Sequence, residues 1–296
     1  MGAVMAQRSS PLTGEGIRST WYNPASAGTY NKRSIQAHAR NLWESPVNSE
    51  NILNLAAHFK CIEIARRSGG KAIGFSTLGL RYHFDSYGIL SSQSFQTVMN
   101  LQFRLKNTFL SIGVAPGIQR LSFNEDIVFP GQTGPQTPGS ETQFTMDGGI
   151  QWFGKRFTVG FASQYLNGAN YTGIFFERER HYHAYADYVL TIGSSWDIRT
   201  RITGRMVKNF HTLEGMAYVH YASFPVYIGL GMRNRSTLLF GIYGRLQNFS
   251  LGYFTDYTTS PLTNSSFRSH EVRLTYALFD EGLFNIFDSN RGISSF

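Results

Sequence analysis

Two groups of polar side chains in this sequence have types and spacing that could support chemistry. His181, His183 and Asp187 fall on one face of a single segment, and two imidazoles with a carboxylate can bind a divalent metal ion. His270 and Glu271 could form an acid–base pair, but adjacent residues of a strand point to opposite faces. Because the sequence offers no further committed metal ligand beside His181, His183 and Asp187, we expect these side chains to be part of a polar lining of the lumen rather than a metal site.

The rest of the sequence contains no recognisable catalytic motif. It lacks the nucleophile-elbow, zincin and phosphate-loop motifs of hydrolases, metalloproteases and nucleotide-binding enzymes. The single cysteine, Cys61, excludes an intramolecular disulfide and a thiolate metal cluster. Glu271 faces Arg273 two residues on, where we expect an ion pair. We therefore predict no enzyme activity, no cofactor and no metal.

The segment that carries His270 and Glu271 shows which elements must position these side chains. Residues 270–279 alternate strictly between an apolar face and a polar face. The apolar face holds Val272, Leu274, Tyr276 and Leu278, and the other face holds Glu271, Arg273, Thr275 and Ala277. A period of two with one apolar side is typical of a half-buried β-strand.

The alternation recurs in about fourteen segments, most of them close to the roughly 9–11 residues with which a tilted strand crosses a bilayer. The predicted strands are residues 35–42, 52–60, 72–83, 96–106, 109–120, 143–153, 157–166, 181–193, 196–207, 216–223, 226–233, 237–247, 249–257 and 270–279. We therefore predict an all-β fold, a closed antiparallel transmembrane outer-membrane β-barrel of about 14 strands. The alternative, a soluble β-sandwich assembly, lacks a second element to cover a sheet face.

The connections between these segments carry a second signal. Short turns at 107, 154–156, 194–195 and 248 alternate with longer polar loops at 84–95, 121–142, 167–180, 208–215 and 258–269. Outer-membrane barrels have short periplasmic turns and long external loops, so this pattern predicts that both barrel termini are periplasmic. Two connections break the rule, because 61–71 is long for a periplasmic turn and 234–236 is short for an external loop.

Composition agrees with this class of protein. Aromatic residues make up 15% of the chain, enough for two interfacial girdles. The mean hydropathy is only −0.22, as expected when half of each strand faces a wet lumen. The sequence contains no apolar run of the roughly 18 residues that a spanning helix requires.

The charge distribution predicts a basic lumen. The formal net charge is +8, and an arginine on the lipid face at mid-bilayer would cost about 2–4 kcal/mol. The arginines that alternation places on the lumen face are Arg104, Arg199, Arg201, Arg205, Arg245 and Arg273. Such an interior suits an acidic peptide, a carboxylated solute or a plug segment of the chain itself. Nucleic acid is excluded as a partner, because the barrel would enclose these arginines.

The ends of the chain divide it into further segments. Residues 1–7 have small residues in cleavage-like positions and are interpreted as the remnant of a signal peptide. Residues 8–34 form an N-terminal periplasmic or lumenal segment, 35–279 the barrel, and 280–296 a C-terminal tail. Within the N-terminal segment, Asn23 and Pro24 predict a turn, because proline fixes its own φ and restricts the preceding residue.

Four short motifs resemble those of one family. Trp-Tyr-Asn-Pro-Ala-Ser-Ala-Gly at 21–28 resembles the opening signature of the PorP/SprF family of type IX secretion system outer-membrane proteins. Arg-Asn-Leu-Trp at 40–43, Gly-Tyr-Phe-Thr-Asp at 252–256 and Ser-His-Glu at 269–271 are similar to its later elements. Ser26 and Leu42 depart from the family pattern, where tyrosine and glutamine are usual. The motifs appear in the family's order.

The resemblance implies a barrel that binds a secreted partner, such as a surface adhesin of a gliding or cell-surface system, and assists its export or anchoring. Its implied partners also include other type IX secretion components and the lipid bilayer of the bacterial outer membrane. We predict partner contacts at Asn23 and Pro24, and in the loop 121–142 at the apolar residues Phe123, Ile127, Val128 and Phe129. Alternatively, these four loop side chains fold into the mouth of the barrel and do not contact a partner. The alternative function, suggested by the basic lumen alone, is a passive anion-preferring porin.

Overall fold

The computed structural model describes residues 20–29, 33–43, 50–64, 74–87, 90–123, 139–171, 176–221, 224–259 and 266–278. The predicted signal remnant 1–7 and tail 280–296 lie outside these ranges, as do Ile127, Val128 and Phe129. Among the residues described, no helix is long and apolar enough to cross a membrane.

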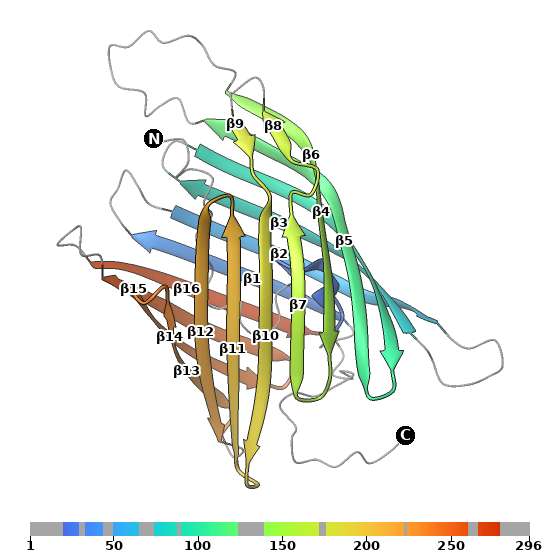
Figure 1. Ribbon diagram of the computed structural model, residues 1–296, viewed down its shortest axis with the longest axis vertical. Helices are drawn as coiled ribbons and strands as arrows, with labels where there is room; N and C mark the ends of the chain where they lie inside the picture. Colours follow the sequence, from blue (N-terminus) through green and yellow to red (C-terminus); the bar gives the residue numbers. More distant parts are fainter. Residues whose placement is uncertain are drawn as a thin grey trace.

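Fourteen antiparallel strands close into one barrel, and the fold class predicted from the sequence is confirmed (Figure 1). The barrel strands are β1 (Arg33–Trp43), β2 (Glu50–Ile64), β3 (Gly74–Tyr87), β4 (Leu90–Leu105), β5 (Thr108–Phe123), β6 (Ser140–Phe153), β7 (Phe157–Gln164), β10 (His181–Ile192), β11 (Trp196–Val207), β12 (Phe210–Tyr221), β13 (Val226–Arg233), β14 (Thr237–Leu246), β15 (Phe249–Thr259) and β16 (Ser266–Ala277). Two three-residue strands, β8 (Ala169–Tyr171) and β9 (Phe176–Arg178), form a separate two-stranded sheet.

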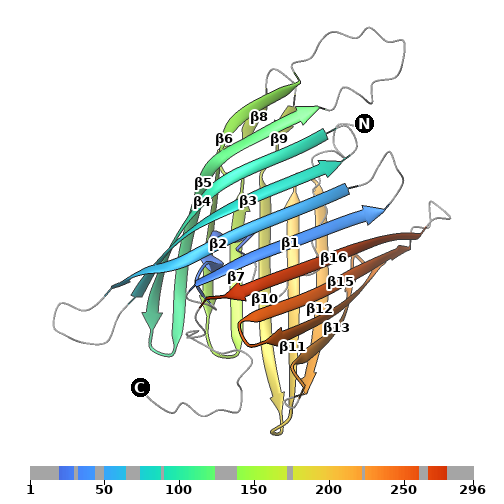
Figure 2. The same cartoon turned by 180° about the vertical axis from the view of Figure 1, so that it is seen from behind.

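The first and last strands complete the cylinder. β1 pairs with β16 from Ser34 opposite Ala277 to Trp43 opposite Arg268, and Figure 2 shows the two strands side by side. Every other barrel strand pairs with its neighbours along the chain, apart from the step from β7 to β10 around the β8–β9 hairpin. Closure removes the free sheet edges that an open β-protein must otherwise protect.

The wall has an apolar outside and a polar inside, as the alternation predicts. In β16, Val272 and Leu274 point outward, with 48% and 43% of their surface exposed, whereas Glu271 and Arg273 are buried inside. Large apolar side chains cover the outside of the other strands in the same way, as at Ile202 on β11. A lipid bilayer is the environment in which such an exterior is stable.

Two of the predicted long loops are wrong. β3 and β4 continue to Tyr87 and Leu90, and β11 and β12 are joined by a turn at 208–209, so neither 84–95 nor 208–215 is a loop. Alternation fades at these strand ends because polar residues occupy both faces where the strands pass beyond the apolar band. The short 234–236 connection is real, and positive φ angles at Asn234 and Arg235 make its tight turn.

The predicted segregation of connections by length is therefore weaker than the sequence suggested. The two longest, between β5 and β6 and between β7 and β10, do lie at the same end of the barrel. We call this the long-loop end. The connection after β2 begins later than predicted, because the strand runs on to Ile64. The strand itself is irregular, with a register shift between Lys60 and Ile62.

Candidate functional site

Residues Thr20–Thr29, which we call the plug, lie inside the barrel. The centre of the plug is a single 3-10 turn, Pro24–Ser26, in which the fixed φ of Pro24 suits the first helical position. Asn23 caps the turn, because its side-chain oxygen accepts a hydrogen bond from the backbone N–H of Ala25 at 2.9 Å. Asn23, Ala25 and Ala27 have no exposed surface.

The barrel wall binds the backbone of the plug through donors on β4 and β5. Asn100 donates to the carbonyl oxygens of Ala25 and Ala27, both at 2.7 Å. Ser111 donates to the Ala25 carbonyl at 2.6 Å, and Gln102 to the Ala27 carbonyl at 2.8 Å. These buried carbonyls would otherwise lose their hydrogen bonds to water, so the wall side chains fix where the plug sits.

Glycines in the wall leave the space that the plug fills. A Cβ atom at Gly113 would overlap the Pro24–Ala25 peptide, and one at Gly149 would overlap the side-chain oxygen of Asn23. Gly28 of the plug has a φ of +68°, which favours glycine. The close fit requires these positions to stay without side chains.

Aromatic residues at the start of the plug pack against cationic and imidazole groups. The Tyr22 ring stacks on His183 with 4.4 Å between centroids, and the Arg205 guanidinium lies 4.9 Å from the Tyr22 centroid. Trp21 lies 5.3 Å from the His83 ring. Contacts between a guanidinium and an aromatic face add attraction to the area that the rings bury.

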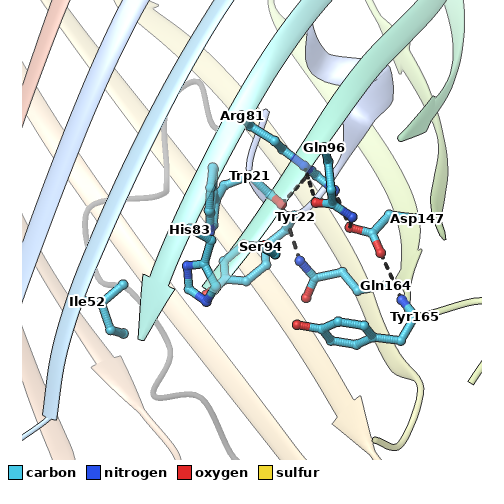
Figure 3. A pocket seen from close by; sticks show the side chains of 10 residues that line it. All are labelled: Trp21, Tyr22, Ile52, Arg81, His83, Ser94, Gln96, Asp147, Gln164 and Tyr165. Atoms are coloured by element: carbon cyan, nitrogen blue, oxygen red, sulfur yellow. Dashed lines mark hydrogen bonds and ion pairs between the residues drawn. The ribbon is translucent and has the colours of Figure 1, made fainter. Parts of the chain in front are cut away.

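A buried polar cluster connects Trp21 to three strands, as Figure 3 shows. Arg81 on β3 donates to the carbonyl oxygens of Thr20 and Trp21, each at 2.9 Å, and to the carboxylate of Asp147 on β6. Gln96 on β4 accepts from Arg81 at 2.7 Å and donates to Asp147 at 3.2 Å. The small cavity that these residues line has a volume of about 20 Å³, room for about one water molecule.

On the side of the lumen away from the plug, side chains of the wall itself pack into the interior. Tyr218 and Phe254 are fully buried in an inward-facing apolar cluster, which also contains Met216, Tyr227, Leu239 and Tyr243. Gly229 and Gly241 make room for it, because a Cβ at either position would overlap the rings of Tyr218 or Phe254. Plug and side chains therefore occupy opposite sides of the interior.

A chain of buried ion pairs joins strands β1, β16, β15, β13 and β12. Arg40 on β1 donates to Glu271 on β16 and to Asp256 on β15, both at 3.1 Å. Arg233 on β13 donates to the same Asp256 and to Glu214 on β12, both at 2.9 Å. Glu271 thus forms an ion pair in the lumen, as the sequence predicts, and its partners include Arg40 and His38.

The lumen contains buried groups of both charge signs. Arg199, Arg201 and Arg205 do point inward, and Asp187 lies 3.5 Å from Arg199 and 3.7 Å from Arg201. Arg273 is also buried, whereas Arg104 and Arg245 lie at strand ends near turns. The buried carboxylates of the described residues are Glu50, Asp85, Asp147, Asp187, Asp197, Glu214, Asp256 and Glu271, and the buried arginines are Arg40, Arg81, Arg199, Arg233 and Arg273. Among these described residues, eight buried carboxylates outnumber five buried arginines.

The histidines lie on the faces of their strands that the alternating sequence pattern predicts. His181 and His183 are buried in the lumen with Asp187, and the described residues contain no group of three or more ligands arranged to hold a metal ion. His270 points outward, where its Nδ1 lies 2.6 Å from the Tyr253 hydroxyl, while Glu271 points inward. Their opposite orientations agree with the prediction that they do not act as a pair.

Two of the predicted partner residues, Asn23 and Pro24, are buried, whereas Ile127, Val128 and Phe129 lie outside the described residues. Asn23 donates to the Ile150 carbonyl and to the Tyr185 hydroxyl, both at 3.1 Å, and Pro24 is buried beside it. The structure thus gives them contacts within the chain, and their partner role stays a prediction. Phe123 ends β5 at the long-loop end, next to the undescribed residues of the loop.

Sequence reasoning missed the residues that hold the plug. Asn100 and Ser111 look like any other lumen-facing polar residues of a strand, and no alternation marks Thr20–Thr29 as part of the barrel. Two features of the sequence could have indicated these contacts: the motif at 21–28, and the glycines at the inward positions 113 and 149, which leave room for the plug.

A closed barrel of fourteen strands with an apolar outer face and a plugged polar interior defines the class, an outer-membrane β-barrel. The family described as type IX secretion system membrane protein PorP/SprF matches residues 19–276. The chain belongs to this family, and it is thus a barrel of the type IX secretion system. No curated protein matches the sequence.

Several solved barrels are similar in fold at low identity. A FadL homologue of Pseudomonas aeruginosa is 11% identical with a TM-score of 0.46, and the match covers 87% of this chain and 93% of that one. The toluene transporter TodX of Pseudomonas putida is 8% identical with a TM-score of 0.49, covering 90% and 94%. The KdgM porin in complex with oligogalacturonate is 8% identical with a TM-score of 0.36, covering 83% and 99%.

Proposed function

We propose that this barrel binds a secreted partner protein, such as an adhesin, and assists its export or its anchoring at the cell surface. The observation that carries the proposal is the filled lumen, in which the plug is hydrogen-bonded on β4 and β5 and an aromatic cluster occupies the other side. A protein of the secretion system with such an interior acts through its surface. Other type IX components are the further partners, and it has no enzymatic role.

The lengths of the connections support an orientation of the barrel. We place both barrel termini in the periplasm and the long-loop end outside the cell, because outer-membrane barrels extend their longer loops outward. The loop between β5 and β6, which contains the predicted contacts Ile127, Val128 and Phe129, then connects its two strands on the outer side of the membrane, where we propose that the partner binds.

The experiment compares a deletion strain with the same strain complemented by the wild-type gene. We expect the deletion to remove one or a few secreted proteins from the surface proteome and to leave the uptake of small antibiotics nearly unchanged. Complementation should restore the lost proteins. An unchanged surface proteome with a selective loss of solute uptake would instead support the anion-preferring porin.

A further inference from the structure

An apolar hollow of about 530 Å³ lies on the outer face of the barrel, over β5, β6, β7, β10 and β11. Figure 1 shows β7, β10 and β11 side by side. Phe161 and Ile202 are among the taller side chains around the hollow, and they point outward with 50% and 59% of their surface exposed. Ligand sites typically have volumes of roughly 300–1,000 Å³. The hollow therefore has the size of a ligand site and opens toward the hydrocarbon of the bilayer.

Small residues line this hollow at positions where the strands could carry larger ones. Ala184 and Ala186 on β10 and Gly204 on β11 lie on the outward face. Among the described residues, a Cβ atom at Gly204 would meet only the Ala184 carbonyl oxygen, at 4.0 Å, so packing within the barrel does not require glycine there. Glycine inside a strand weakens it and often marks a place where a ligand approaches the backbone. A ligand outside the barrel accounts for the missing side chain.

A basic turn lies at one end of the hollow. Lys155 and Arg156 belong to the turn between β6 and β7, close to Trp152 of the lining, and both are exposed. The Arg156 carbonyl accepts a hydrogen bond from the Val189 N–H at 2.8 Å, so the turn also lies against β10. Trp152 is outward and half exposed, as is typical of the aromatic residues that mark the interface between membrane and water. Two cationic side chains thus stand at the interface, where the hollow leads into the apolar band.

We propose that this hollow binds a phospholipid of the inner leaflet of the outer membrane, with an acyl chain in the hollow and the phosphate at Lys155 and Arg156. The medium at this depth is hydrocarbon, in which an acyl chain is at home, whereas a polypeptide backbone must first satisfy its own hydrogen bonds. Guanidinium and ammonium groups are suited to bind a phosphate. The choice of leaflet rests on the proposed orientation, in which this turn is periplasmic, and cysteine labelling at the turn tests that orientation separately.

The test is native mass spectrometry of the purified, delipidated barrel titrated with phosphatidylglycerol. We expect the wild-type protein to form a complex with one lipid at concentrations at which further lipids do not bind. Ala184→Phe fills the hollow and should lose this complex. The matched control, Ala39→Phe, replaces another exposed outward alanine, on β1, and should keep it.

The role of the basic turn is tested with a double variant, Lys155→Gln and Arg156→Gln. This variant leaves the hollow intact, so the complex with one lipid should form only at a higher concentration of phosphatidylglycerol. Unchanged binding by the double variant, or equal binding by Ala184→Phe and the wild type, would overturn the proposal.

A second measurement covers the case in which Ala184→Phe does not fold. A photo-crosslinking amino acid at position 202, in the hollow, should capture a phospholipid that stays bound when the membrane is extracted with detergent. One at position 272, on the outward face of β16, should not. A crosslink from position 202 to a protein would assign the hollow to a transmembrane partner and overturn the lipid proposal, as would the same yield of lipid crosslinks from both positions.

Discussion

Arg40 and Glu271 lie directly opposite each other across the seam between the first and last strands, and Nη1 of Arg40 is 3.1 Å from Oε1 of Glu271. Both belong to motifs that resemble the family, as does Asp256, the second carboxylate bound by Arg40. Three motifs, one from the first barrel strand and two from the last two strands, thus meet in one buried ion cluster. Their physical role in this chain is to join the strands that close the barrel.

Removing one charge of this cluster should destabilise the barrel. Arg40→Gln leaves Glu271 and Asp256 without one of their cationic partners, and breaking a buried ion pair in this way costs about 3–5 kcal/mol. We expect the folded band of the purified protein to be lost at a lower temperature or urea concentration.

The control for this prediction is an exposed pair. Lys208 and Glu179 lie 2.6 Å apart, but the Lys208 side chain is 54% exposed. Lys208→Ala should change stability by only about 0–1 kcal/mol, as for most surface ion pairs. Equal stability of Arg40→Gln and the wild type would show that the seam does not depend on the cluster.

Enlarging Gly113 should expel the plug. The new side chain in Gly113→Val would overlap the Pro24–Ala25 peptide, and such overpacking costs typically about 1–3 kcal/mol. We expect a cysteine at the buried Ser26 position to react with maleimide faster in this variant, with Cys61→Ser as the common background. Gly215→Val, where no atom lies within 4 Å of the added Cβ, should leave the labelling rate unchanged.

A charge on the outer face should be tolerated only near the ends of strands. Val272 lies in the middle of β16 and points outward, so Val272→Arg should cost about 2–4 kcal/mol and reduce insertion. Leu246 ends β14 next to a turn, and Leu246→Arg should cost about 0–1 kcal/mol. The yield of heat-modifiable protein measures both, and equal yields would contradict the assigned depth.

The proposed orientation can be tested with single cysteines in a Cys61→Ser background. Asn209 lies in the turn after β11 at the long-loop end, and Lys155 lies in the turn after β6 at the opposite end. Both are exposed. A membrane-impermeant maleimide should label Asn209→Cys on intact cells and leave Lys155→Cys unlabelled until the outer membrane is permeabilised. The reverse pattern would invert the topology.

The sequence predicted the strands and their faces well because alternation depends on the membrane itself. Val272 must face lipid and Glu271 must not, so the period of two survives in every spanning segment. Strand ends were predicted poorly, since beyond the apolar band neither face is required to be apolar. The strand pair up to Tyr87 and Leu90 was therefore predicted as a loop.

The interior depends on contacts between distant segments, which local pattern does not encode. The sequence predicted that Glu271 would pair with Arg273 because the two share a face two residues apart. In the structure Arg40 is directly opposite Glu271 on the neighbouring strand and 3.1 Å from it, a cross-strand partner that spacing within one strand does not indicate. Likewise, Asn100 resembles many other lumenal residues in the sequence, and its role follows only from the hydrogen bonds that it donates to the carbonyls of Ala25 and Ala27.

The central claim is that this barrel works through its surface and not through a pore. Its most direct test is the conductance of the purified wild-type protein in a planar bilayer, with a known open porin as the positive control. A lumen filled by the plug and by the Tyr218–Phe254 cluster predicts no steady channel. A stable, anion-preferring conductance of the wild-type protein would contradict the account.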